Sequence, residues 1–168
     1  MVIIRAETAE DYDAVRRVNE LAFGRPDEAR LVDRLRGTSP HVSLVAVEEG
    51  RVVGHIFFSP VSIGSQGTGE AAMGLAPMAV VPERQGGGIG SRLVREGLEE
   101  CRRRGCGVVV VLGHADYYPR FGFAPASRKG LRCKWPVGDE HFMALELAPG
   151  ALGGAGGLVE YRPEFDEV

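Results

Sequence analysis

A glycine-rich turn is the segment of this sequence best suited to chemistry. Residues 82–91 read Pro-Glu-Arg-Gln-Gly-Gly-Gly-Ile-Gly-Ser, between an apolar run that ends at Val81 and a helical pattern that starts near Ile89. Glycines permit positive φ and let a ligand approach the backbone, and the first N–H groups of a helix have no partner within it. The positive end of the helix dipole lies at the same point. The turn is therefore predicted to bind an anion, and a pyrophosphate suits it.

Two common pyrophosphate motifs do not match this turn. A Walker A loop needs Lys and then Ser or Thr after its last glycine, whereas here Arg92 follows Ser91 and the turn has no lysine. A dinucleotide fingerprint started at Gly86 or Gly88 meets Ser91 or Leu93 where its third Gly or Ala belongs. Magnesium-nucleotide and dinucleotide sites are therefore disfavoured.

A kinked strand and a long helix flank the turn. Residues 72–81 are predicted to form a strand that is distorted at Pro77, because proline cannot donate a ladder hydrogen bond. Residues 89–104 show the clearest helical pattern, with one apolar stripe and with acidic and basic residues four apart outside it. The run 108–112 is apolar and β-branched, as expected of a strand covered on both faces. This strand-helix-strand order predicts a parallel, right-handed crossover.

The rest of the chain is predicted to form short strands and helices, with a glycine-rich loop near its end. In chain order these are a strand at 2–4, helices capped by Thr8 and Asp27, a hairpin of 42–47 and 52–63, a short helix at 115–121, a strand at 142–147, the loop at 149–157 and a tail at 158–168.

Size, composition and charge exclude several protein classes. The chain has 168 residues, of which 44% are hydrophobic and 26% charged, so we expect one globular domain over residues 1–168. Its net charge of -3 gives no support to a nucleic-acid partner. Residues 1–7 do not resemble a signal peptide, and no run reaches the roughly 18 apolar residues of a membrane span. The 3 cysteines lack the Cys-x-x-Cys spacing of a zinc or redox site, so we expect no metal and a cytoplasmic location.

The pattern Gln-x-x-Gly-x-Gly, filled by Gln85, Gly88 and Gly90, closely resembles motif A of the GCN5-related N-acetyltransferase (GNAT) family. It follows a kinked strand, and a Tyr-x-x-x-Gly-Phe segment lies behind the next strand. The order of elements over about residues 2–147 also resembles the GNAT fold. The resemblance implies an α/β fold with a mixed, largely antiparallel central sheet of six to seven strands. In such a fold strands 4 and 5 splay apart, about four helices flank the sheet, and the motif core here is 71–123.

The resemblance implies that acyl-coenzyme A lies between the splayed strands, here 72–81 and 108–112. The backbone near the end of the first strand pairs with the pantetheine arm like an added strand, because a free strand edge offers unpaired N–H and C=O groups. The backbone of the glycine turn holds the pyrophosphate, and Arg84 or Arg92 is a candidate contact for the 3′-phosphate. The implied cofactor-binding residues are Met78, Ala79, Val80, Gln85, Gly86, Gly87, Gly88, Ile89, Gly90 and Ser91.

Attack of an amine on a thioester needs a polarised carbonyl and a proton for the departing thiolate. An N–H in the stretch 77–79 is the candidate donor to the oxyanion. The family commonly supplies the proton from a tyrosine, and Tyr118 matches its Tyr-x-x-x-Gly-Phe pattern, so Tyr118 is predicted to be the general acid. The alternative is that its ring only covers the core. The family's frequent Asn after the second splayed strand is replaced here by the segment that begins at Gly113.

Several candidates stay open for the other roles at the site. Trp135 either lines an acceptor pocket or packs in the core. The general base is sought among His114, Glu70, Glu48 and His55.

The predicted function is transfer of an acetyl group from acetyl-CoA to a primary amine by direct attack in a ternary complex. No cysteine lies in a recognisable activated setting, so a covalent acetyl-enzyme is not required. The acceptor is a small molecule or a peptide, with neither a nucleic acid nor a membrane as partner, and a homodimer is compatible with the sequence. The alternative function is a catalytically weak acyl-CoA-binding or sensor module. A plain nucleotide binder is disfavoured by the missing lysine.

Overall fold

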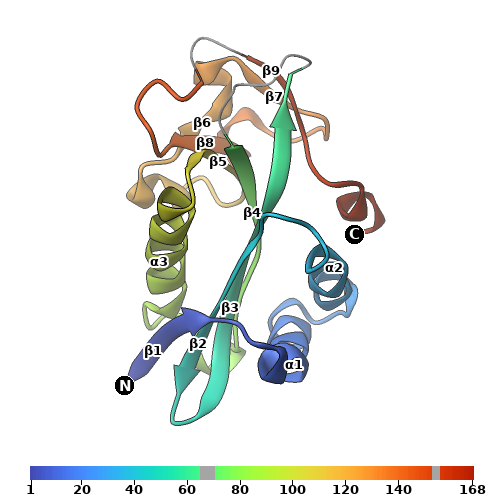
Figure 1. Cartoon of the computed structure of the whole chain (residues 1–168), viewed down its shortest axis with the longest axis vertical. Helices are drawn as coiled ribbons and strands as arrows, with labels where there is room; N and C mark the ends of the chain where they lie inside the picture. Colours follow the sequence, from blue (N-terminus) through green and yellow to red (C-terminus); the bar gives the residue numbers. More distant parts are fainter. Residues whose placement is uncertain (65–70, 153–155) are drawn as a thin grey trace. The chain divides into compact units, whose positions relative to one another are not determined.

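The computed structural model describes residues 1–64, 71–152 and 156–168, which include most of the predicted elements (Figure 1). The chain divides into two compact units, and β3 (Arg51–Ile63), β4 (Ala71–Val80) and α3 (Ile89–Arg103) run through both. The first unit comprises Met1–Ser59, Ala76–Glu99 and Pro163–Val168, and the second comprises Pro60–Leu75 and Glu100–Arg162. The expectation of a single domain over residues 1–168 stays a prediction.

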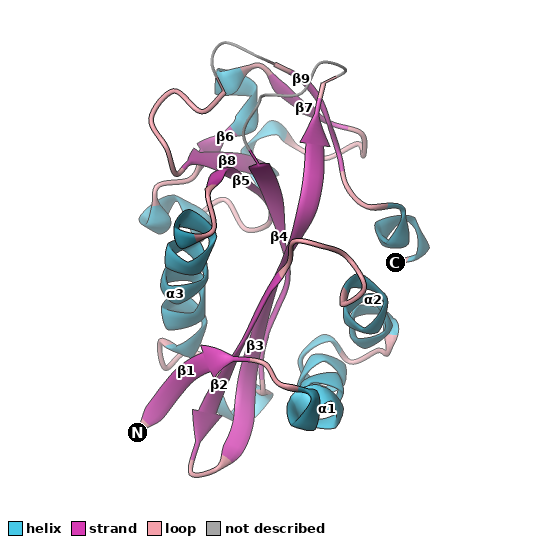
Figure 2. Cartoon of the chain, in the orientation of Figure 1, coloured by secondary structure: helices cyan, strands magenta, loops and turns pink. Residues whose placement is uncertain are grey.

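In the first unit, β1 (Val2–Ala6), β2 (Val42–Glu48) and β3 form an antiparallel sheet, with β4 beside β3. A short 3-10 turn, Ala9–Asp11, leads into α1 (Tyr12–Phe23), which is followed by α2 (Asp27–Leu35). Helices α1 and α2 lie on one side of these strands and α3 on the other (Figure 2). Both faces of the strands are therefore covered, which explains why β2 and β3 are apolar along most of their length.

Helix α3 packs unusually closely on β3 of the first unit. A Cβ added at Gly54 would lie 3.0 Å from Leu93 Cδ1, and one added at Gly97 would lie 2.4 Å from Phe58 Cε1. A side chain at Gly97 would displace the ring of Phe58, and one at Gly54 would require a smaller shift of Leu93, because protein cores have little spare volume. The predicted apolar stripe of the helix is confirmed as buried at Ile89, Leu93, Val94, Leu98 and Cys101.

In the second unit, β4 pairs in parallel with β5 (Cys106–Leu112), and β5 pairs antiparallel with β8 (Phe142–Glu146). The predicted parallel crossover is thus confirmed. The β4–β5 register runs from Ala71↔Cys106 to Leu75↔Val111, whereas β4 itself continues to Val80. A ladder that stops short of the end of β4, just before Pro77, is what the expectation of splayed strands requires.

The fold class is confirmed as a mixed, largely antiparallel α/β arrangement, with two differences in detail. The described residues form nine strands, more than the six to seven expected. The additional short strands are β6 (Ala124–Pro125), β7 (Leu131–Cys133) and β9 (Gly157–Glu160). They are two to four residues long and pair with distant segments, so no local pattern marks them.

The second difference concerns the helices: the described residues contain three α-helices, and the predicted helix at 115–121 is only the 3-10 helix Tyr118–Phe121. Pro119 and a left-handed Gly122 leave too few residues to nucleate an α-helix there. The predicted loop 149–157 includes residues 153–155, which lie outside the described residues. None of the described helices is both long and apolar enough to cross a membrane.

Candidate functional site

A 3-10 turn, Pro82–Arg84, leads from the end of β4 into the glycine turn within the first unit. The N–H of Arg84 donates to the carbonyl of Val81 at 2.9 Å, and the N–H of Gln85 donates to the carbonyl of Pro82 at 3.3 Å. The side-chain amide of Gln85 then reaches back and donates from Nε2 to the carbonyl of Val80 at 2.9 Å. The turn is therefore tied to the strand through a side chain as well as through the backbone.

Two glycines give the turn its shape. Gly86 has φ +82° and Gly88 has φ +90°, in the left-handed region that other residues adopt only with strain. A Cβ added at either position would meet no atom within 4 Å, so space remains on that side of the backbone. The N–H of Arg92 donates to the carbonyl of Gly88 at 3.1 Å, which makes the turn the N-terminus of α3. In general the first N–H groups of a helix have no acceptor within it. This is the geometry that an anion-binding turn requires.

The last residues of β4 present their backbone groups alternately to two sides. The N–H of Val81 donates to the carbonyl of Val53 on β3 at 2.9 Å. Because backbone groups alternate in direction along a strand, those of Ala79 also face β3, whereas those of Met78 and Val80 face away from it. The bond from Gln85 to the Val80 carbonyl agrees with this direction. Of the three residues expected to contact pantetheine, Met78 and Val80 are therefore the suitable ones.

The arginines near the turn are held by the protein's own atoms. Arg84 forms an ion pair with Glu48, and Arg92 Nη1 donates to the carbonyl of Val2 at 2.8 Å. Glu48, a candidate general base, is thus the counter-charge of an arginine beside the turn. Both guanidinium groups are therefore engaged by atoms of β1 and β2.

His55, another candidate base, is fully buried in the first unit. Its Nδ1 lies 3.3 Å from Asn19 Nδ2, and its Nε2 lies 2.9 Å from Ser43 Oγ. Asn19 Nδ2 also donates to the carbonyl of Val15 at 3.0 Å, so this nitrogen is the donor, Nδ1 accepts and Nε2 carries the hydrogen. Burial and, to a smaller extent, the charge of Arg36 lower the pKa of His55 to about 3. The neutral ring of His55, on β3, therefore links to α1 and β2 by hydrogen bonds. Because it is fully buried, it cannot contact an amine substrate directly.

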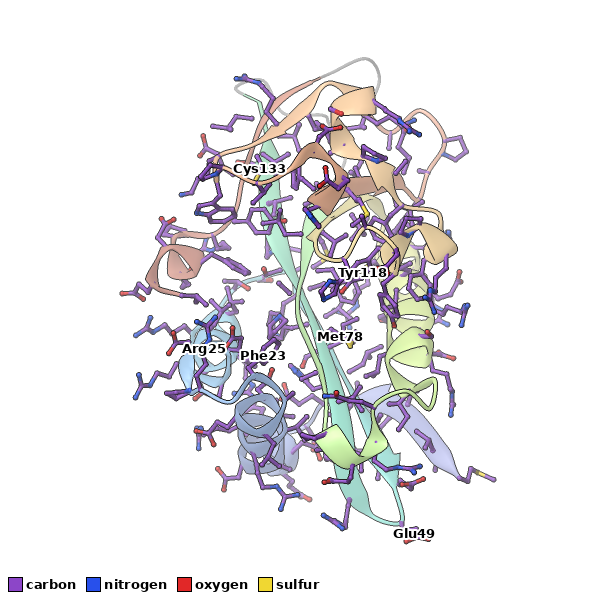
Figure 3. The ribbon with its side chains drawn as sticks, turned by 180° about the vertical axis from the view of Figure 1, so that it is seen from behind. Phe23, Arg25, Glu49, Met78, Tyr118 and Cys133 are labelled. Carbon is purple, nitrogen blue, oxygen red and sulfur yellow. The ribbon has the colours of Figure 1, made fainter. Side chains whose placement is uncertain are left out.

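Tyr118, the predicted general acid, belongs to the second unit and begins the 3-10 helix that it shares with Phe121. Its side chain is surrounded by others in Figure 3, and the residue is only 7% exposed. Its ring lies 5.0 Å from that of Tyr117 and 5.8 Å from that of Phe123, edge-on in both cases. Burial, with a contribution from Tyr117, raises the pKa of Tyr118 to about 12, so the phenol keeps its proton at neutral pH.

The hydroxyl of Tyr118 forms no hydrogen bond with any residue in the described part of the chain. The phenol therefore has a proton to donate, which is the first requirement of a general acid.

The other candidate residues lie in less favourable positions for catalysis or substrate binding. His114 is exposed, and its carbonyl accepts the N–H of Tyr117 at 3.1 Å, so its visible role is in the backbone of the turn before Tyr118. The half-buried ring of Trp135 lies 5.1 Å from that of buried Tyr161, which is a packing contact. Glu70 lies outside the described residues. No group of three or more His, Cys, Asp or Glu side chains suited to a metal occurs in residues 1–64, 71–152 and 156–168.

Sequence reasoning missed two features of the site. One is the bond from the Gln85 side chain, which was assigned to the turn only through its backbone. The other is Gly113, named only as the start of the segment that replaces the family's asparagine. It lies directly beneath the Tyr118 ring. The signal for the second was present as a glycine at a strand end five residues before a tyrosine, but nothing local shows that the two meet.

Comparison with known proteins connects this geometry to a family. The family model for the acetyltransferase (GNAT) domain matches residues 3–126. The chain is 38% identical over 167 residues to the uncharacterized N-acetyltransferase YhbS of Escherichia coli K12, which covers 98% of this chain and 99% of that protein.

Two solved structures resemble the chain over nearly its whole length. The crystal structure of YhbS from Escherichia coli in complex with CoA superposes with a TM-score of 0.91 at 37% identity, covering 98% of this chain and 92% of that one. A GNAT family acetyltransferase from Brucella melitensis in complex with acetyl-CoA superposes with a TM-score of 0.80 at 38% identity, covering 99% of both chains.

Proposed function

Since the chain belongs to the GNAT family of acetyltransferases, we propose that it transfers the acetyl group of acetyl-CoA to a primary amine. The observation that carries the proposal is the turn between β4 and α3, where left-handed Gly86 and Gly88 precede a helix N-terminus and leave space beside the backbone. The acceptor is a small molecule or a peptide.

The cofactor is held mainly by backbone groups in this proposal. The backbone of Gln85–Ser91 binds the pyrophosphate through the N–H groups that are not used within the turn, with Arg84 and Arg92 nearby. The backbone of Met78 and the N–H of Val80 pair with the pantetheine arm. The two similar structures are complexes with CoA and acetyl-CoA, which supports the choice of cofactor. Side-chain substitutions along the end of β4 are therefore expected to be mild.

The chemistry proceeds in two steps. The neutral amine attacks the thioester carbonyl carbon, and the N–H of Met78, which faces away from β3, stabilises the oxyanion. The C–S bond then breaks as the carbonyl re-forms, the Tyr118 hydroxyl protonates the departing thiolate, and the amine nitrogen loses a proton to a base or to water.

Direct transfer, without an acetyl-cysteine, is supported by the state of the thiols. Cys101 and Cys106 are buried, and the hydrogen bond between them and the burial raise the pKa of Cys101. Burial also raises the pKa of Cys133, so neither Cys101 nor Cys133 is an activated nucleophile. The buried thiol of Cys106 donates to the carbonyl of Val108 at 3.1 Å. All three are free, which supports the reducing cytoplasm as the compartment.

A thiol-release assay with acetyl-CoA and a panel of amines tests the proposal. The panel contains small polyamines, amino sugars and peptides with free N-termini or lysines, and calorimetry measures CoA binding in parallel. We expect CoA binding and turnover with at least one amine. Absence of CoA binding would refute the proposal, and tight binding without any turnover would favour the sensor module instead.

A further inference from the structure

The ring of Tyr118 lies directly on the backbone of Gly113 within the second unit. A Cβ added at Gly113 would lie 2.3 Å from Tyr118 Cε2 and 2.8 Å from Cδ2. The optimal separation of two non-bonded carbon atoms is about 3.5–4.0 Å, so a side chain at residue 113 would overlap with the Tyr118 ring.

Gly113 is not free to move away from the ring. Its N–H donates to the carbonyl of His141 at 3.0 Å, and its own carbonyl lies 3.0 Å from His141 Nδ1. Because a carbonyl only accepts, Nδ1 carries the hydrogen in this contact. The β5–β8 register continues directly from here with Leu112↔Phe142. A methyl group at residue 113 would therefore displace the tyrosine ring rather than the strand.

We propose that Gly113 is the positioning residue for the Tyr118 hydroxyl: its missing side chain and its backbone, held by His141, form the seat that sets where the ring lies. The inference rests on the proposed function, because it takes Tyr118 as the general acid. A residue as large as asparagine could not take the place of Gly113, since its side chain could not share the site with the ring.

The size of the expected effect follows from the geometry of proton transfer. Relief of the contact requires a shift of the ring by about 1 Å, and a misplacement of about 1 Å at a reacting group can lower a rate on the order of 10²-fold. Gly113 does not lie in the left-handed region, so alanine at this position is not strained by the backbone itself.

The test is the variant Gly113→Ala, compared with Gly37→Ala as a matched control. A Cβ at Gly37 would lie 3.7 Å from the carbonyl oxygen of Arg34, an ordinary contact. We expect Gly113→Ala to lower kcat roughly 10- to 100-fold with KM for acetyl-CoA changed by less than about twofold, and Gly37→Ala to change neither. A Gly113→Ala enzyme with wild-type kcat would overturn the inference.

A double-mutant cycle with Tyr118→Phe separates positioning from a general structural effect. If Gly113 acts through the hydroxyl, adding Gly113→Ala to Tyr118→Phe lowers kcat by less than about twofold further. Equal losses in both backgrounds would overturn the inference. Wild-type kcat in Tyr118→Phe alone would instead show that Tyr118 is not the acid, which is a failure of the proposed function.

If Gly113→Ala does not fold, the pair Gly113→Ala with Tyr118→Ala keeps the inference testable. Removal of the ring frees the space for the new methyl group, so this double variant should unfold at the same temperature as Tyr118→Ala alone. A double variant that is still unfolded would show that Gly113→Ala does not act through its contact with the Tyr118 ring, which would overturn the inference.

Discussion

The side-chain Nε2 of Gln85 donates a 2.9 Å hydrogen bond to the backbone carbonyl of Val80, which joins the glycine turn to the last residue of β4. The Val80 carbonyl faces away from β3, on the side proposed for the pantetheine arm. The bond therefore occupies the carbonyl of Val80, which leaves the N–H of this residue for the proposed pairing with the pantetheine arm. In the proposed cofactor site, Gln85 therefore acts through its side chain as well as its backbone.

Replacing Gln85 by alanine is expected to weaken CoA binding roughly 2- to 10-fold, the loss of one hydrogen bond that orders the turn. Gln85→Glu should be worse, because a carboxylate oxygen would face a carbonyl oxygen and would add negative charge near a diphosphate. Calorimetric titration with CoA measures both. Glu83→Ala, in the exposed 3-10 turn just before, is the control and should bind as the wild type does. Equal affinity in all variants would show that the bond is incidental.

Gly88→Ala should weaken CoA binding by at least about 10-fold, because φ +90° costs an L-residue about 1–2 kcal/mol and a relaxed backbone would turn its N–H groups away. Gly24→Ala is the matched control. Gly24 is also in the left-handed region, with φ +70° and no atom within 4 Å of an added Cβ, but it lies outside the turn. Titrations of both variants decide the matter, and a Gly88→Ala protein that binds CoA normally would contradict the proposed pyrophosphate site.

Tyr118→Phe should lower kcat on the order of 10²-fold, because the ring stays in place while the proton donor is lost. KM for acetyl-CoA and the unfolding temperature should change little. Steady-state kinetics with the best amine found in the panel provides the measurement. An unchanged kcat would return Tyr118 to a purely structural role.

His55 makes stability depend on pH in a defined direction. Its pKa is about 3 in the folded chain against 6.5 for a free histidine, so the unfolded chain takes up the proton first as the pH falls. This contribution to stability is complete above pH 6.5 and is lost progressively below it, by up to about 1.4 kcal/mol per pH unit.

Denaturant unfolding from pH 7 to pH 4 measures this slope. The variant His55→Gln should show a shallower loss of unfolding free energy than the wild type, whatever its stability at pH 7. His114→Gln, at an exposed position, is the control and should keep the wild-type slope. If His55→Gln and the wild type lose stability in parallel, the buried histidine is not the cause.

Local patterns determined much of this protein. The glycine turn before a helix, the apolar stripe from Ile89 to Cys101 and the β-branched run 108–112 each depend on neighbours within a few residues, so the sequence alone specified the α/β class and the segment proposed to hold pyrophosphate. Tyr118 could also be proposed, because its pattern lies within six residues.

Tertiary structure decided the rest. Strands β6, β7 and β9 are too short to be recognised from the local sequence, and they form because distant segments pair with them. The neutral state of His55 depends on Asn19, Ser43 and burial, and the seat of Tyr118 depends on a glycine held by His141. Such contacts join residues that are remote in the chain, or they depend on how neighbouring side chains pack. They contribute to stability only when the fold brings the atoms together.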